Sequence, residues 1–126
     1  MERFRSWFLL VTCMSFLVGC GGGGPVLDEA DSALVDARTA IADGDTEGAL
    51  ALLDKSIELK PDTWSYYERA RLHAELGDDE AAKADVAAGL EMDEEHSELL
   101  WLEKQLKKSK RARFKGRAGQ PPSASK

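Results

Sequence analysis

The sequence predicts an all-α domain built from antiparallel helix hairpins. The segments 40–49 and 73–82 align with each other at an offset of 33 residues, so that Gly77-Asp78 repeats Gly44-Asp45. Small apolar residues recur at three- and four-residue spacing around each Gly-Asp pair, which is the period of a helix with one buried face. No segment alternates apolar and polar residues with β-branched content, so the sequence predicts no strand.

The first hairpin is predicted to turn at Gly44 and Asp45. Its first helix has an apolar face formed by Ala33, Ala37, Ala40 and Ile41. Glycine readily adopts the positive φ that ends a helix, and an aspartate after it can accept the free amide hydrogens of the next helix. The second helix has a buried face formed by Ala49, Leu50, Leu52, Leu53 and Ile57. Pro61 ends that helix because proline lacks the amide hydrogen that a continuing helix requires.

The second hairpin repeats this plan around Gly77 and Asp78. Its first helix carries Tyr66, Tyr67, Ala70 and Ala74, and its second helix carries Ala82, Val86, Leu90 and Met92. A further helix from Ser97 to about Lys110 is predicted to cap the stack, because a terminal repeat needs cover for its apolar face.

The two hairpins resemble tetratricopeptide repeats over about residues 30–96. The matching positions are Ala37, Gly44, Asp45, Ala49, Ile57 and Pro61 in the first unit, and Tyr66, Ala70, Gly77, Asp78, Ala82 and Leu90 in the second. The departures from the family pattern are Asp36, Ser56, Gly89 and Glu94. The resemblance implies a fold of two repeats and a capping helix over residues 28–106. The alternative is a generic helical bundle whose two Gly-Asp turns coincide.

The first 20 residues have the composition of an export signal. Two arginines precede an apolar run over 7–18, which is too short for a membrane span of ~20 residues. The segment from Leu17 to Cys20 resembles the lipobox of bacterial lipoproteins. That resemblance implies a signal peptide over 1–19, acylation of Cys20, and a lipidated, glycine-rich tether over 20–27. The alternatives are a secreted protein with a chance cysteine and an uncleaved membrane anchor.

Charge is divided unevenly along the chain. The net charge is −6, but residues 25–103 carry 22 acidic and 6 basic residues, whereas 104–126 carry nine basic residues and no acidic one. Such a division is typical of a folded body with an interaction tail. Cys13 lies in the leader, so the predicted mature chain retains Cys20 alone and has no disulfide within it.

A partner-binding face is predicted on the first helix of each unit, because the resemblance implies that these helices line a concave surface. Aromatic and arginine side chains contribute most at protein interfaces. The candidate residues are Leu34, Arg38, Trp64, Tyr67, Arg71 and Trp101. We expect this face to hold a short partner segment with apolar anchors and one carboxylate. In the alternative, Tyr67 and Trp101 complete the core of a small domain. The family's chaperone-tail clamp uses asparagine, and this sequence contains none.

The tail over 107–126 is predicted to be basic and largely disordered. Its candidate polyanion-binding residues are Lys107, Lys108, Lys110, Arg111, Arg113, Lys115 and Arg117. Clusters of this kind bind phosphate-rich surfaces. Export would separate the chain from nucleic acid, so we expect anionic lipid, lipopolysaccharide or cell-wall polymer instead. In the alternative, the tail is solvated and folds back on the acidic body.

The residues do not indicate an enzyme. Only His73 and His96 are available as histidines, and they lack metal-ligand spacing. The acidic run over 93–95 lacks the spaced ligands of a calcium loop. We therefore expect no catalytic residue, no metal and no cofactor.

The sequence thus predicts a lipid-anchored, protein-binding adaptor of the bacterial cell envelope, involved in envelope or secretion-complex assembly. We expect it at the outer membrane, facing the periplasm, rather than at the inner membrane. The alternative is a structural envelope lipoprotein whose tail binds cell-wall polymer or anionic lipid.

Overall fold

The computed structural model describes residues 27–115 and 120–125, and this part of the chain is entirely helical. Its α-helices are α1 (Glu29–Asp43), α2 (Thr46–Leu59), α3 (Thr63–Leu76), α4 (Asp79–Met92) and α5 (Ser97–Leu106). Two short 3-10 helices follow, η1 (Lys110–Ala112) and η3 (Pro122–Ser125). The predicted all-α class and hairpin order are confirmed, and α5 ends about four residues earlier than expected.

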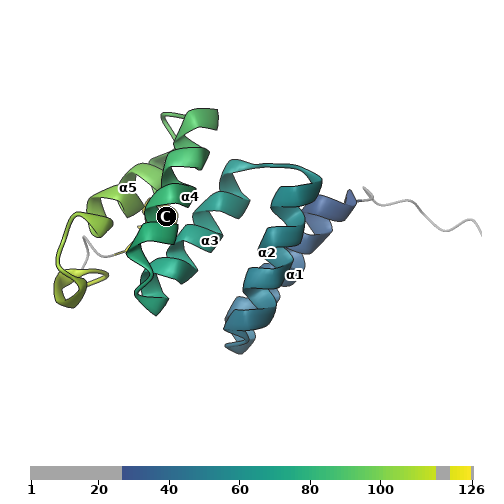
Figure 1. Cartoon of the computed structure of the whole chain (residues 1–126), viewed down its shortest axis with the longest axis horizontal. Helices are drawn as coiled ribbons and strands as arrows, with labels where there is room; N and C mark the ends of the chain where they lie inside the picture. Colours follow the sequence, from purple (N-terminus) through teal and green to yellow (C-terminus); the bar gives the residue numbers. More distant parts are fainter. Residues whose placement is uncertain (1–26, 116–119, 126) are drawn as a thin grey trace, which may run out of the picture.

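The helices stack side by side as hairpins (Figure 1). Helices α1 and α2 form the hairpin at one end, α3 and α4 form the next, and α5 packs against α4 at the other end. After α5 the chain turns back along the stack (Figure 1). Within the described residues, no helix is both long enough and apolar enough to cross a membrane.

Both hairpin corners have the predicted geometry. Gly44 and Gly77 adopt φ values of 80° and 86°, which are left-handed conformations that favour glycine. Asp45 then accepts the Gly48 amide hydrogen at 2.9 Å, and Asp78 accepts that of Ala81 at 3.2 Å. Each corner therefore ends one helix and begins the next through local chemistry alone.

The core divides into two clusters, one for each part of the stack. The first lies between α1, α2 and α3 and contains Ala37, Ala49, Leu53 and Leu72. The second lies between α3, α4 and α5 and contains Tyr67, Ala70, Ala74, Ala82, Val86, Leu99, Leu102 and Leu106. Alanine lines the helix crossings, so the helix axes can approach closely while leucine fills the remaining space.

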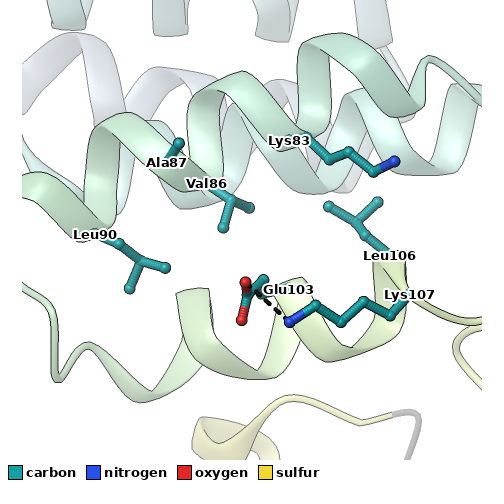
Figure 2. A pocket seen from close by; sticks show the side chains of 7 residues that line it. All are labelled: Lys83, Val86, Ala87, Leu90, Glu103, Leu106 and Lys107. Carbon is teal, nitrogen blue, oxygen red and sulfur yellow. Dashed lines mark ion pairs between the residues drawn. The ribbon is translucent and has the colours of Figure 1, made fainter.

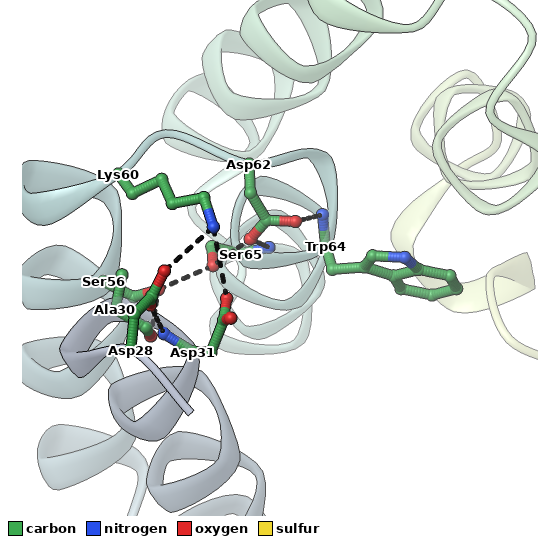
Figure 3. Close-up of polar contacts among 8 residues, drawn as sticks. All are labelled: Asp28, Ala30, Asp31, Ser56, Lys60, Asp62, Trp64 and Ser65. Carbon is green, nitrogen blue, oxygen red and sulfur yellow. Dashed lines mark hydrogen bonds and ion pairs between the residues drawn. The ribbon is translucent and has the colours of Figure 1, made fainter. Parts of the chain in front are cut away.

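Ser56 departs from the family pattern because it joins three helices (Figure 3). Its Oγ is buried, donates to the Ala30 carbonyl of α1 at 3.0 Å, and lies 2.9 Å from the Oγ of Ser65 on α3. Asp62, the N-cap of α3, accepts hydrogen bonds from the Ser65 amide and hydroxyl. The polar cluster therefore fixes the first hairpin against the second.

Gly89 departs from the pattern for a steric reason. A Cβ at this position would lie 2.6 Å from Leu99 Cδ1 and 3.3 Å from the Cβ of Tyr66. Because Leu99 is fully buried, it has little room to move away. Glycine at this position therefore lets α5 approach α4 closely.

Candidate functional site

The predicted arginine row is present and is bridged by a glutamate. Arg38 on α1 donates from Nε to Glu68 Oε1 at 3.1 Å, and Glu68 Oε2 lies 3.7 Å from Arg71 Nη1. Arg71 also pairs with Glu75, with its Nε 3.4 Å from Glu75 Oε1. The acidic side chain of Glu68, which sequence reasoning did not identify, thus holds the two arginines on one face.

Trp64 is the aromatic residue of this face that is most open to solvent. Trp64 has 38% of its surface exposed, and its indole points away from the polar cluster of Ser65 and Asp62 (Figure 3). The Arg38 guanidinium lies 5.6 Å from the centre of the Trp64 ring, within cation–π range. The His96 ring packs edge-on against Trp64 with a centroid separation of 4.7 Å. Contacts on two sides therefore hold this indole at the surface.

Tyr67 does not lie at an exposed position as expected. It is 2% exposed and belongs to the second core cluster. Its ring lies 6.0 Å from that of Trp64 and 6.4 Å from that of His96. The buried N-cap of α5, His96, packs beside Tyr67, so the alternative of a core residue is correct for Tyr67. Burial raises the pKa of the Tyr67 phenol above its usual range.

Three buried polar atoms around this face lack hydrogen-bond partners in the described part of the chain. They are Tyr67 Oη, Arg71 Nε and His96 Nε2. His96 Nδ1 accepts the Leu99 amide hydrogen at 3.4 Å, so the neutral ring carries its proton on Nε2. His96 Nε2 is therefore a donor, and the Tyr67 hydroxyl can also donate. Arg71 Nε faces the Glu75 carboxylate at 3.4 Å. Unsatisfied buried donors are rare in folded proteins.

Leu34 and Trp101, the ends of the predicted apolar row, are both partly buried. Leu34 packs against the first core cluster, and Trp101 packs against the second. The Trp101 ring also contacts Phe114 of the tail, with centroids 5.8 Å apart. Of the candidate residues, Arg38 and Trp64 are therefore the more exposed ones, and the structure has no continuous exposed row from Leu34 to Trp101 among its described residues.

The basic tail folds back on the body as far as residue 115. Arg113 was predicted to bind polyanions, but it is 7% exposed and forms a bidentate pair with Asp79 at 2.6 and 2.9 Å. It also donates to the carbonyls of Leu106 and Lys108 at 3.0 and 3.1 Å, respectively. The prediction that Arg113 is open to a ligand is therefore wrong for this conformation.

The neighbouring cations have a range of environments. Lys110 donates to the Gly77 carbonyl at 2.7 Å, Lys107 pairs with Glu103 at 3.0 Å, and Lys108 donates to the Gln105 side chain at 3.1 Å. Arg111 and Lys115 are exposed. Arg117 lies outside the described residues, as does Cys20.

The hydrogen bonds from Arg113 hold the pKa of Asp79 below its usual range. A carboxyl with a lowered pKa stabilises the folded form above its unfolded pKa and loses that contribution as the pH falls through its folded pKa. The stabilisation that this charged hydrogen bond contributes is therefore complete near neutral pH and is lost as the pH falls through the lowered pKa of Asp79.

Sequence reasoning also missed Arg69, which joins α2, α3 and α4. Its guanidinium contacts Asp85 at 2.9 and 2.6 Å and Asp54 at 2.6 Å, and it lies over the Tyr66 ring. No local sequence signal predicts this contact, because the two carboxylates lie 15 and 16 residues from Arg69 along the chain.

A shallow, mostly apolar pocket of about 180 Å³ lies between α4 and α5 (Figure 2). It is lined by Lys83, Val86, Ala87, Leu90, Glu103, Leu106 and Lys107. Its polar groups are those of the lysines and Glu103, and Glu103 pairs with Lys107. Over residues 27–115 and 120–125, no group of three or more His, Cys, Asp or Glu side chains could hold a metal ion.

Comparison with known proteins supports the repeat fold. The family model of the tetratricopeptide repeat matches residues 65–96, which include α3 from its third residue, the α3–α4 corner and all of α4. The DnaJ homolog subfamily C member 3 of Gallus gallus is 32% identical over 93 residues, covering 67% of this chain. The chain spans 18% of the length of that relative. No solved structure matches the chain significantly. The chain thus carries a tetratricopeptide repeat, a fold that typically serves as a protein-binding scaffold.

Proposed function

We propose that this chain is an adaptor that holds a segment of a partner protein on the face formed by α1, α3 and the start of α5. The observation that carries the proposal is an exposed Trp64 held between Arg38 and His96, beside the buried His96 Nε2, which has no hydrogen-bond partner in the described part of the chain. Tryptophan and arginine are the side chains most enriched at interface hot spots. Because contacts with the fold already order Trp64, a partner would lose little additional side-chain entropy on binding it.

The chemistry of the face favours a partner segment with one apolar anchor and one acceptor group. Trp64 offers apolar area, and Arg38 keeps almost half of its side-chain surface exposed while it pairs with Glu68. The unsatisfied donor on His96 suits a carboxylate or a main-chain carbonyl of the partner.

Replacing Trp64 with alanine should remove partner binding without unfolding the domain. Loss of a hot-spot side chain costs ~2 kcal/mol or more, which weakens binding by about 30-fold. Chemical crosslinking in native membranes followed by mass spectrometry should give partner adducts that decrease more than tenfold in Trp64→Ala, by the same estimate. Met92→Ala is the matched control, because Met92 is also an exposed large apolar residue, at 51% against 38% for Trp64, but lies at the end of α4.

Adducts that survive Trp64→Ala, or that fall equally in Met92→Ala, would contradict a binding role for this face. Thermal unfolding of both variants must match that of the unmodified chain for the comparison to apply.

We further propose that the adaptor is tethered to an envelope membrane of a bacterium through lipid on Cys20, with the outer membrane as its expected location. The proposal rests on the order of leader, lipobox-like segment and glycine tether in the sequence. Each buried CH₂ of an acyl chain contributes ~0.8 kcal/mol, so several chains on one cysteine would anchor the protein stably.

Cys20→Ser should abolish incorporation of labelled palmitate and move the chain from the detergent phase to the aqueous phase. Cys13→Ser provides the control, because Cys13 lies within the predicted leader and is expected to leave with it. Labelling that persists in Cys20→Ser, or that depends on Cys13, would show that the lipobox interpretation is wrong. Density fractionation of the labelled protein then tests the outer membrane against the inner one.

A further inference from the structure

The segment 107–115 is strongly charged and yet packed against the body. It contains six cations and no acidic residue. Arg113 and Lys110 point to the α3–α4 corner, where they contact Asp79 and the Gly77 carbonyl. Lys107 pairs with Glu103 on α5. Lys110 also lies close enough to Asp79 for its charge to lower the pKa of that carboxyl. The charges of half of the cations in this segment are therefore compensated by carboxylates of the chain itself.

The other half remain available to an outside anion. Within the described residues, Lys108, Arg111 and Lys115 form no ion pair with a carboxylate. Lys108 donates to the neutral Gln105 side chain, which leaves its charge uncompensated. The packed tail thus presents about half of the charge that the same segment would present if it were released.

The packed conformation also contains local strain. Phe114 has a φ of 55°, the only positive φ at a non-glycine position in the described part of the chain. The left-handed region is unfavourable for side chains with a Cβ, so the contact of Phe114 with Trp101 must compensate for it. Like charges crowded into this short segment repel one another as well.

We propose that residues 107–115 form a releasable cap on α5, and that an array of phosphate groups binds the cap in its released form. The released segment offers all six cations to the ligand, whereas the packed one offers three. A ligand that binds one of two conformations more tightly shifts the population toward that conformation. Binding therefore separates Arg113 from Asp79 and withdraws Phe114 from Trp101. This inference is independent of the proposed partner-binding function.

Inorganic polyphosphate is the probe for the first test, with the full chain held in zwitterionic detergent. Asp79→Asn removes the negative charge and one of the two oxygen acceptors of Arg113, so it should populate the released cap and strengthen polyphosphate binding. If the released form makes up about 10% of the unmodified protein, the affinity gain approaches roughly tenfold. Glu80→Gln is the matched control. It also removes one negative charge from the first turn of α4, but Glu80 is exposed and does not contact the tail.

Equal affinities of Asp79→Asn and Glu80→Gln would overturn the proposal, because the gain would then come from net charge alone. Both substitutions leave the Asp78 cap of α4 intact. Thermal unfolding before the titration verifies that each variant is folded.

The salt dependence of binding provides a second, independent test in the unmodified chain. The logarithm of the binding constant falls with that of the salt concentration by about 0.7 to 0.9 for each phosphate neutralised. Release predicts a slope of about −4 to −5, whereas binding to the packed cap predicts about −2 to −3. A slope in the second range would overturn the proposal.

Hydrogen exchange locates the structural change and distinguishes sources of phosphate. Polyphosphate should increase amide exchange within 107–115, including the Ala112 amide that donates to Ser109. A parallel arm replaces polyphosphate with phosphatidylglycerol in mixed micelles, and phosphatidylcholine serves as its control. A response to polyphosphate alone identifies free phosphate chains as the ligand, and a response to phosphatidylglycerol identifies lipid headgroups. Unchanged exchange in both arms would contradict the proposal.

Discussion

Leu53→Ala should lower the free energy of unfolding by about 3 kcal/mol, as expected for a leucine removed from a closed core. Leu53 has no exposed surface, and the first core cluster around it contains Ala37, Ala49 and Leu72. Two of these neighbours are alanines, whose short side chains cannot extend into the space that Leu53 would leave. The resulting cavity therefore adds to the lost transfer free energy.

The loss of stability in Leu53→Ala should be concentrated in the first hairpin, because each repeat in a stack contacts only its neighbours. Hydrogen exchange in Leu53→Ala should rise across α1 and α2 while the amides of α4 and α5 keep their protection. Leu76→Ala, at an exposed position of α3, should change stability little. A uniform rise in exchange over all five helices would contradict repeat-by-repeat unfolding.

The helices and corners could be predicted from the sequence because they depend on local chemistry. Gly44 and Gly77 take positive φ, and the aspartate after each accepts an amide hydrogen three residues on. Both effects act within a few residues, so they can be read without knowing the fold. The end of α5 was misplaced by about four residues, because the chain leaves the helix to bring Arg113 to Asp79.

The candidate binding face could be predicted only in part. The repeat offset correctly placed Arg38 and Arg71 on one face, since equivalent positions of successive first helices are neighbours. It could not show that His96 packs beside Tyr67 and that Tyr67 is buried, because this depends on how α5 meets α3. The bridging role of Glu68 likewise appears only when α1 and α3 lie side by side.

The contacts of the tail likewise could not be predicted from the sequence. The positive charge of the tail predicted an anionic ligand from outside, whereas Asp79 of the folded body supplies a carboxylate to Arg113. Arg113 and Asp79 are 34 residues apart, and many carboxylates of the acidic body could have served equally well by composition. Selection of Asp79 requires the end of α5 to lie beside the α3–α4 corner, which is a property of the packed stack.

Arg69→Met should destabilise the domain by about 2 to 3 kcal/mol, because it leaves the carboxylate of Asp85 buried without its partner. The side chain of Asp85 is 8% exposed and shares a bidentate contact with Arg69. Methionine retains most of the aliphatic stem but removes the guanidinium that lies over Tyr66, so the lost stability includes this cation–π contact as well as the ion pairs. Urea unfolding of the variant and the unmodified chain measures the difference.

The two acidic partners of Arg69 provide an internal control. Asp54 contacts the same guanidinium at 2.6 Å, but its side chain is 57% exposed. Water can solvate the exposed Asp54 carboxylate in place of Arg69, so Asp54→Ala should lower the free energy of unfolding by less than ~1 kcal/mol. Equal losses for Asp54→Ala and Arg69→Met would show that burial does not set the strength of these contacts.

The double variant Arg69→Met, Asp85→Leu separates the two contributions to the loss. It removes the unpaired carboxylate together with the arginine, and replacing a buried ion pair with apolar side chains is often close to neutral. We therefore expect it to recover most of the stability lost in Arg69→Met. If the double variant stays as unstable as the single one, the loss comes from the broken connection between α2, α3 and α4 rather than from the buried charge.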